Sequence, residues 1–233
     1  MTDQTTGPSG AGTALAPALI FDLDGTLIDS APAIHAVSNA VLAAQGFPTL
    51  SLEEVRSFVG KGVPHLVRCL LQRHGENPDG PLYATVHDDL ILRYETEVEG
   101  NTPYPGVIAA LEQLAALGCA MAVATNKPLR PAIAALRHVG MDHFFPVVLG
   151  GDSLPTRKPD PAMVHDAARQ LGRTRALYIG DSEVDAETAM NADLPFVLFN
   201  EGYRKTPVED LRHAANFQHF SQLPDIVMGW TWR

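Results

Sequence analysis

The sequence predicts an α/β protein whose parallel sheet is interrupted, after its first strand, by an inserted helical segment. Beyond Tyr104, short apolar runs alternate with helical patterns, the order typical of a parallel sheet with helices on both faces and right-handed crossovers. Residues 32–101 instead contain successive helical patterns without a convincing strand, too long a segment for one crossover. We therefore expect a flexible N-terminal tail (1–16), a core (17–31 and 102–233) and a helical cap (32–101).

Composition narrows the class of protein before any motif is considered. The 233 residues carry a formal net charge of −10 without a basic run, which argues against nucleic-acid binding. No apolar run is long enough to span a membrane, and Met1 to Ala16 has neither the positive start nor the apolar centre of a signal peptide. Cys69 and Cys119 lie in separate apolar contexts typical of buried thiols. These features favour a cytoplasmic protein.

The first strand pattern, Leu19 to Leu27, places two carboxylates two residues apart. An apolar run leads into Asp22 and Asp24, and Gly25 permits the sharp turn that follows. The two aspartates therefore lie at the carboxyl end of a buried strand, where open α/β sheets bind their ligands. Asp22 could bind a cation and attack phosphorus, and Asp24 could move a proton. The alternative is that both residues only stabilise a turn.

Four helices are expected in the inserted segment, over about 32–45, 51–58, 64–74 and 82–97. Ser30 is a candidate N-cap for the first helix, and Ser51, followed by Glu53 and Glu54, for the second. The segment begins and ends beside the Asp22 site, so it could cover that site as a lid. A purely structural helical appendage is the alternative.

The rest of the chain predicts four further strands and four helices in alternation. The strands are expected over about 119–124, 146–149, 175–179 and 195–199, and the helices over about 105–117, 129–139, 161–171 and 184–191. The C-terminal segment, with Trp230 and Trp232, is expected to add a last short helix or edge segment.

Four strand ends carry groups suited to phosphate chemistry, and in a parallel sheet they converge on one edge. They are Asp22 and Asp24; Thr125 and Asn126; Lys158; and Asp181, Ser182 and Asp185. Taken singly, each has an ordinary alternative as a helix cap or a solvated side chain. Together they can form an oxygen-rich Mg²⁺ site from the Asp22 and Asp181 carboxylates and the Asp24 carbonyl. Lys158, the Thr125 hydroxyl and N–H groups near Asn126 can then bind phosphate.

Asp22-Leu-Asp-Gly-Thr, Thr125-Asn, Lys158-Pro and Gly180-Asp-Ser-x-x-Asp185 resemble, in order, the four motifs of haloacid dehalogenase-like phosphatases. The resemblance covers about Ala18 to Val208 and implies a Rossmann-like core with a helical cap inserted after the first motif. It implies Mg²⁺ as the cofactor. It also implies these roles: Asp22 as nucleophile and metal ligand, Asp24 as general acid/base and carbonyl ligand, Thr125, Asn126 and Lys158 as phosphate-binding residues, Asp181 as metal ligand, and Ser182 and Asp185 as its support.

The segments Tyr104-Pro-Gly, Lys158-Pro-Asp-Pro and Tyr178-Ile-Gly-Asp-Ser are most similar to phosphoglycolate phosphatases. Asp24 argues against dehalogenases and phosphonatases, because they lack an aspartate at the matching position. The resemblance implies a monomer or homodimer acting on a small phosphorylated metabolite. Other phosphate-ester or pyrophosphate hydrolases and a phosphosugar mutase remain alternatives, as does a non-catalytic phosphate-dependent binding or regulatory protein.

Substrate choice is expected to lie in the cap, at the Gly60-Lys61-Gly62 turn. Lys61, or nearby Arg68, could meet a substrate carboxylate when the cap closes; the alternative is that Lys61 is only a solvated turn residue. The nine histidines form no His-x-x-x-His pair, so we expect no zinc site.

Overall fold

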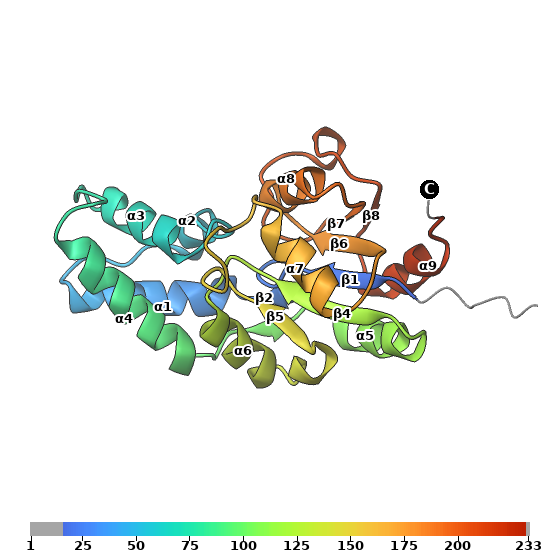
Figure 1. Cartoon of the computed structure of the whole chain (residues 1–233). Helices are drawn as coiled ribbons and strands as arrows, with labels where there is room; N and C mark the ends of the chain where they lie inside the picture. Colours follow the sequence, from blue (N-terminus) through green and yellow to red (C-terminus); the bar gives the residue numbers. More distant parts are fainter. Residues whose placement is uncertain (1–15, 232–233) are drawn as a thin grey trace, which may run out of the picture.

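The computed structural model describes residues 16–231 of the chain. The tail expected over 1–16 therefore falls outside the described residues except for Ala16, and so does Trp232. Figure 1 shows a sheet with its flanking helices and, to one side, a group of four helices. In the described residues, no helix has both the length and the apolar character needed to cross a membrane.

The centre of the fold is a six-stranded sheet in which every paired neighbour is parallel, as the sequence predicts. Its strands are short, apolar and mostly buried, because helices cover both faces. In spatial order they are β5 (Val147–Leu149), β4 (Ala120–Ala124), β1 (Ala18–Phe21), β6 (Ala176–Gly180), β7 (Phe196–Phe199) and β8 (Ala215–Phe217).

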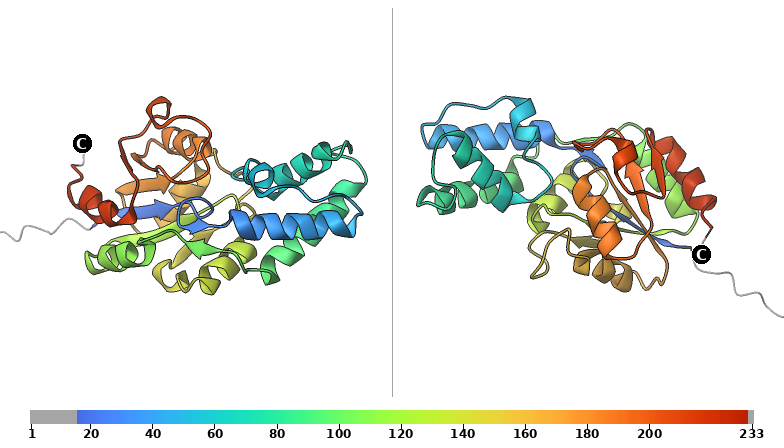
Figure 2. Two further views of the ribbon diagram at one scale, coloured as in Figure 1. Left: turned by 180° about the vertical axis from the view of Figure 1, so that it is seen from behind. Right: turned by 90° about the horizontal axis from the view of Figure 1, so that it is seen from above.

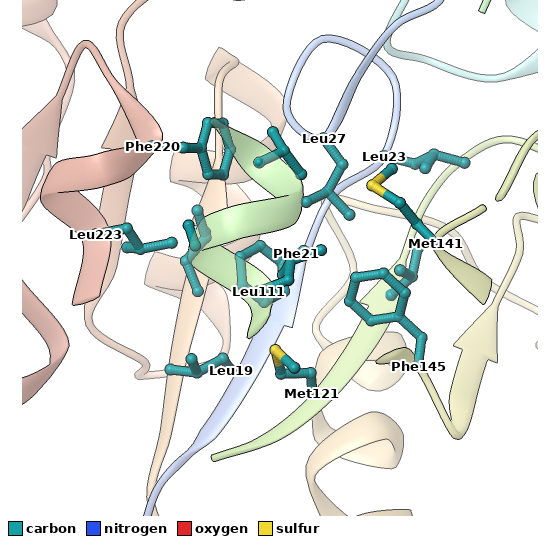
Figure 3. Packing of buried hydrophobic residues seen from close by; sticks show 14 of the residues in the cluster. Leu19, Phe21, Leu23, Leu27, Leu111, Met121, Met141, Phe145, Phe220 and Leu223 are labelled. Atoms are coloured by element: carbon teal, nitrogen blue, oxygen red, sulfur yellow. The ribbon is translucent and has the colours of Figure 1, made fainter. Parts of the chain in front are cut away.

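Side chains of β1 alternate between two hydrophobic clusters because successive strand residues point to opposite faces. Leu19 and Phe21 belong to the cluster drawn in Figure 3, with residues of α5 (Val107–Ala116), α6 (Leu129–His138) and α9 (Leu223–Met228). Ala18 and Ile20 belong to the opposite cluster, with residues of α7 (Ala162–Gln170) and α8 (Glu183–Asn191). Packing on both faces therefore holds β1, and the residues that follow it, at the centre of the molecule.

The inserted segment forms four helices with a hydrophobic cluster of their own. They are α1 (Ala31–Ala44), α2 (Leu52–Arg56), α3 (Val63–Arg73) and α4 (Leu82–Thr96). Their buried residues run from Ile34 to Tyr94 without contribution from the sheet. Figure 2 shows this group beside the sheet domain in two further views. We call residues 31–96 the helical cap.

A two-stranded antiparallel pair joins the cap to the sheet domain. β2 (Ile28–Asp29) precedes α1, and β3 (Thr102–Pro103) follows α4. The chain therefore enters and leaves the cap at neighbouring points. Neither this pair nor β8 was predicted from the sequence.

The N-cap predicted from the sequence is present at α2 but absent at α1. Ser51 and Glu54 form the reciprocal capping box at α2. Ser30, expected to cap α1, makes no side-chain cap. Instead, the N–H groups of Ser30 and Ala31 both donate to the Tyr203 hydroxyl at 2.8 Å. That tyrosine lies more than 170 residues further along the chain, so local sequence could not predict this cap.

Candidate active site

The carboxyl ends of four neighbouring strands bring the expected site residues together. Asp22 directly follows β1, at the centre of the sheet, and Thr125 follows β4 on one side. Asp181 follows β6 on the other side, and Lys158 lies in the segment after β5. All four side chains are buried. The topology thus places these four side chains at one edge of the sheet.

Lys158 forms the positive centre of this edge. Its side chain is only 1% exposed, and its Nζ lies 2.7 Å from Asp22 Oδ1 and 2.8 Å from Asp185 Oδ1. It also contacts the Tyr178 hydroxyl at 2.9 Å. Burial disfavours the charged amine, but the Asp185 and Asp22 carboxylates outweigh it and raise the pKa of Lys158 above its usual value. Lys158 therefore stays charged.

Burial and the charge of Lys158 have opposite effects on the pKa of Asp22. Burial raises its pKa to about 7, although the Lys158 charge opposes that rise. The 2.7 Å approach of Lys158 to Asp22 Oδ1 is a charge contact outside hydrogen-bond geometry, and this buried oxygen accepts no hydrogen bond from the described residues. An oxygen in this state is suited to a cation or to reaction with an electrophile.

Asp181 is held from two sides. The Thr26 hydroxyl donates to Oδ1 at 2.7 Å, and the Tyr203 backbone N–H donates to Oδ2 at 2.6 Å. Burial, followed by the Asp185 and Asp22 charges, raises the pKa of Asp181 well above its usual range. Gly202 is required beside it, because a Cβ there would lie 2.2 Å from Asp181 Oδ2.

Asp185 differs from Asp22 and Asp181 because both of its carboxylate oxygens already accept hydrogen bonds from protein donors. Oδ1 accepts from Lys158 and the Tyr178 hydroxyl, while Oδ2 accepts from the backbone N–H groups of Asp181 and Ser182 and from the Ser182 hydroxyl. Burial alone would raise the pKa of Asp185, but Lys158 and these donors outweigh it and lower the pKa. Asp185 and Ser182 also form the capping box of α8, so they fix the loop that carries Asp181.

The acidic groups fit a divalent cation. Carboxylate oxygens of Asp22, Asp181 and Asp185 lie within 4.8 Å of one another in the described part of the chain. The three buried carboxylates share one lysine, so the edge has an excess of negative charge that a cation would neutralise. Since the oxygens of Asp185 are already taken, Asp22 and Asp181 are the carboxylates best placed to bind it. An all-oxygen donor set suits a hard cation.

Thr125 and Asn126 lie beside Asp22, but the side chain of Asn126 is committed elsewhere. Its Oδ1 accepts from the Lys158 N–H at 3.0 Å, and its Nδ2 donates to the carbonyls of Lys158 and Gly60 at 3.1 Å each. The Asn126 amide therefore positions Lys158 and contacts the cap. Phosphate binding at this position would fall to backbone N–H groups and to the Thr125 hydroxyl.

Lys127, which was not predicted from the sequence, also lies at this edge. Its Nζ donates to Asp24 at 3.1 Å and lies 5.0 Å from the centre of the Tyr94 ring in α4. The side chains of Lys127 and Asp24 are 6% and 12% exposed. Its position, directly after Thr125 and Asn126 at a strand end, was the available signal. Tyr203 was missed as well, because its hydroxyl binds Asp29, which is distant in sequence. Tyr178 was missed because a tyrosine inside an apolar strand is typical of the core.

A cavity of about 40 Å³ lies between this edge and the cap. Asp22, Asp24, Thr125 and Lys127 line its polar side, and the cap supplies most of the apolar wall, formed by Ile34, Phe58, Val59, Val63, Leu66 and Tyr94. Lys61 and Arg68 are not among the lining residues. Lys61 is exposed, and Arg68 pairs with Asp79 on the exposed surface at 2.8 Å.

Comparisons with known proteins agree with this arrangement. A family model of haloacid dehalogenase-like hydrolases matches residues 19–199. A phosphoglycolate phosphatase of Rhodobacter capsulatus is 65% identical over 218 residues, which cover 94% of this chain and 100% of the relative. One from Cereibacter sphaeroides is 46% identical, covering 91% and 97%. A crystal structure of a predicted phosphoglycolate phosphatase from Haemophilus somnus superposes with a TM-score of 0.84 at 28% identity, covering 92% and 99%.

Proposed function

This chain belongs to the haloacid dehalogenase-like hydrolases, and from that premise we propose that it is a phosphatase that converts 2-phosphoglycolate to glycolate and phosphate. Relatives that share up to 65% of their residues with it, over nearly their whole length, are phosphoglycolate phosphatases. The observation that carries the chemistry is the buried edge on which Asp22 faces Lys158, with Asp24 and Asp181 beside it. The free thiols Cys69 and Cys119 are compatible with a cytosolic location.

Asp22 is the nucleophile in this proposal. Asp22, Asp181 and the Asp24 carbonyl would hold Mg²⁺, which when bound supplies positive charge against the phosphate oxygens. Lys158 keeps its charge and adds a second positive group beside Asp22. An Asp22 oxygen attacks phosphorus in line with the ester oxygen, forming an aspartyl-phosphate as the P–O ester bond breaks.

Asp24 transfers the protons. It gives a proton to the departing ester oxygen, which leaves as the glycolate hydroxyl. It then takes a proton from the water that attacks phosphorus of the aspartyl-phosphate, releasing phosphate and restoring Asp22. Asp24 is suited to both steps because it lines the cavity two residues after Asp22.

The cap gives the proposed nucleophile an apolar surrounding. Asp22 and Asp24 line one side of the cavity, and apolar side chains of the cap line the other: Ile34, Phe58, Val59, Val63, Leu66 and Tyr94. Charge interactions around a bound phosphate are stronger beside such a wall than in water.

The first test is phosphate release from purified protein with 2-phosphoglycolate, a hexose phosphate, a nucleotide and pyrophosphate, each assayed with Mg²⁺ and with EDTA. We expect 2-phosphoglycolate to give the highest kcat/KM, and EDTA to abolish release. Asp22→Asn should abolish turnover with Mg²⁺ present, because an amide is not a nucleophile here. A higher kcat/KM for another phosphate ester would contradict the substrate, and near-normal turnover by Asp22→Asn would contradict the covalent mechanism.

A further inference from the structure

We propose that Lys127 recognises the carboxylate of the substrate, a role that rests on the proposed hydrolysis of 2-phosphoglycolate. Lys127 lies in the loop that leaves β4, in the sheet domain and not in the cap. Among the described residues that line the cavity, it carries the only positively charged side chain. The structure thus places the recognition of the carboxylate on the catalytic edge itself.

The ammonium of Lys127 is fixed in position and retains donor capacity. Both of its hydrogen bonds go to one carboxylate, Asp24, with Nζ 3.1 Å from Oδ1 and 3.4 Å from Oδ2. An ammonium has three N–H donors, so a second carboxylate can bind beside Asp24. The Tyr94 ring, 5.0 Å from Nζ, supports the cation from the cap side. Because the side chain is already ordered, binding an anion there loses little rotamer entropy.

The location of Lys127 matches the chemistry of the leaving group. In the proposed mechanism, Asp24 protonates the ester oxygen. In 2-phosphoglycolate a single carbon separates that oxygen from the carboxylate, so the carboxylate must lie close to Asp24, as Lys127 does. The surrounding wall is largely apolar, and a charge pair in such surroundings is stronger than one in water.

The two cationic side chains expected from sequence to play this part lie elsewhere. Lys61 is exposed in the turn between α2 and α3. Arg68 is paired with Asp79 and stacks on the Tyr83 ring. Neither lines the cavity, so each would need to move to reach a substrate, whereas Lys127 would not.

The test compares two substrates that differ in one group. 2-Phosphoglycolate and 2-hydroxyethyl phosphate have similar size, but only the first has a carboxylate. We expect Lys127→Met, which keeps the chain length and removes the charge, to lower kcat/KM for 2-phosphoglycolate about 10- to 100-fold more than for 2-hydroxyethyl phosphate. Lys127→Arg should recover part of the discrimination. Arg137→Met, which removes an exposed charge at the far end of α6, is the control and should leave both values near those of the wild type.

The outcomes separate the inference from the function on which it rests. If the wild type does not prefer 2-phosphoglycolate to 2-hydroxyethyl phosphate, the proposed substrate is wrong. If it does, and Lys127→Met lowers both values equally, Lys127 acts only by positioning Asp24 and the inference is wrong. Loss of discrimination in Lys61→Met, with discrimination intact in Lys127→Met, would move the role to the cap turn.

Discussion

Asp22, the proposed nucleophile, has a cost to the stability of the folded protein. Its pKa rises to about 7 because burial outweighs the attraction of Lys158. The folded protein therefore binds one more proton at Asp22 than the unfolded chain does between about pH 4 and pH 7. The contribution of Asp22 to the free energy of unfolding of the metal-free protein thus falls as pH rises through this window, and it levels off above pH 7.

Asp22→Asn should stabilise the metal-free protein. At pH 8 in EDTA we expect a gain on the order of 1 to 3 kcal/mol, seen as a Tm several degrees above that of the wild type. At pH 5, where Asp22 of the wild type is largely protonated, the two Tm values should approach each other. Thermal unfolding followed by circular dichroism measures both.

Magnesium provides the internal control for that variant. We expect Mg²⁺ to bind the folded wild type and to raise its Tm as the Mg²⁺ concentration increases, while the variant, which lacks one of the proposed carboxylate ligands, should respond less. A wild type that is more stable than Asp22→Asn at pH 8 in EDTA would show that the Lys158 charge, not burial, dominates at Asp22.

The site residues that sequence could identify are those that directly follow apolar strands. Asp22, Thr125 and Asp181 each end such a run, and the structure brings them to one edge. Their catalytic roles stay predictions. Tyr178 and Tyr203 could not be found this way, because a tyrosine inside or after an apolar strand is typical of the core. Only the fold shows that their hydroxyls reach Asp185 and Asp29.

At the scale of elements, the loop over residues 200–206 joins the candidate metal site to the cap. The Tyr203 backbone N–H binds Asp181, while its hydroxyl donates to Asp29 and accepts from the start of α1. On the cap side, Arg56 lies over the Tyr203 ring and donates to the Gly202 carbonyl at 3.0 Å. This loop therefore holds the Asp181 carboxylate and also the connection between β2 and α1, which we call the hinge of the cap.

Tyr203→Phe should loosen the hinge without removing the backbone hydrogen bond to Asp181. Loss of the hydroxyl leaves two N–H groups at the start of α1 without this acceptor, so we expect a cost of about 1 to 3 kcal/mol in the free energy of unfolding. Hydrogen exchange at residues 30–34 should accelerate. Urea unfolding in EDTA and exchange mass spectrometry measure these two effects.

Tyr83→Phe is the matched control for that loss. It removes a cap tyrosine hydroxyl that makes no hydrogen bond with the described residues, while leaving the ring between His87 and Arg68. Equal exchange rates at residues 30–34 in the two variants would contradict the capping role of Tyr203.

Elements with local signals were predicted within two or three residues at most ends. The capping box at Ser51 is confirmed, and the five apolar strand patterns correspond to β1, β4, β5, β6 and β7. β2 and β3 were missed because each has only two residues. β8 is no shorter than β5, but it has the sequence Ala-Asn-Phe in place of an apolar run, so it is defined by its partner strand and not by a pattern of its own.

At the scale of the whole molecule, the polar contacts between the cap and the sheet domain are spread over several separate points. Asn126 binds the Gly60 carbonyl, Arg56 donates to the Gly202 carbonyl, and Lys205 donates to the Ser57 carbonyl at 2.7 Å. Arg130 of α6 also pairs with Glu95 of α4, but its side chain is 81% exposed, so that pair contributes at most about 1 kcal/mol. Separate contacts of this kind are compatible with a cap that opens to admit substrate and closes again.

Gly62→Ala and Gly60→Ala form a matched pair that tests this contact. Both glycines have positive φ, +81° and +111°, so an alanine at either position is strained by about 1 kcal/mol. A Cβ at Gly62 would also lie 2.9 Å from the Asn126 carbonyl oxygen, whereas one at Gly60 meets nothing within 4 Å. We expect similar Tm losses but a kcat/KM for Gly62→Ala about 10-fold lower than for Gly60→Ala. Equal kcat/KM values would show that close approach at Gly62 is not needed for turnover.

The β2–β3 pair makes the cap replaceable in evolution. Asp29 and Thr102 are paired neighbours, so the chain leaves the sheet domain and returns to it at two adjacent points. A foreign segment of any length could be inserted at the same two points, provided that its own ends lie one strand spacing apart. Recombination could then exchange the walls around the substrate while the strand ends that carry the aspartates keep their places. Substrate specificity could therefore change through replacement of the whole cap in a single event.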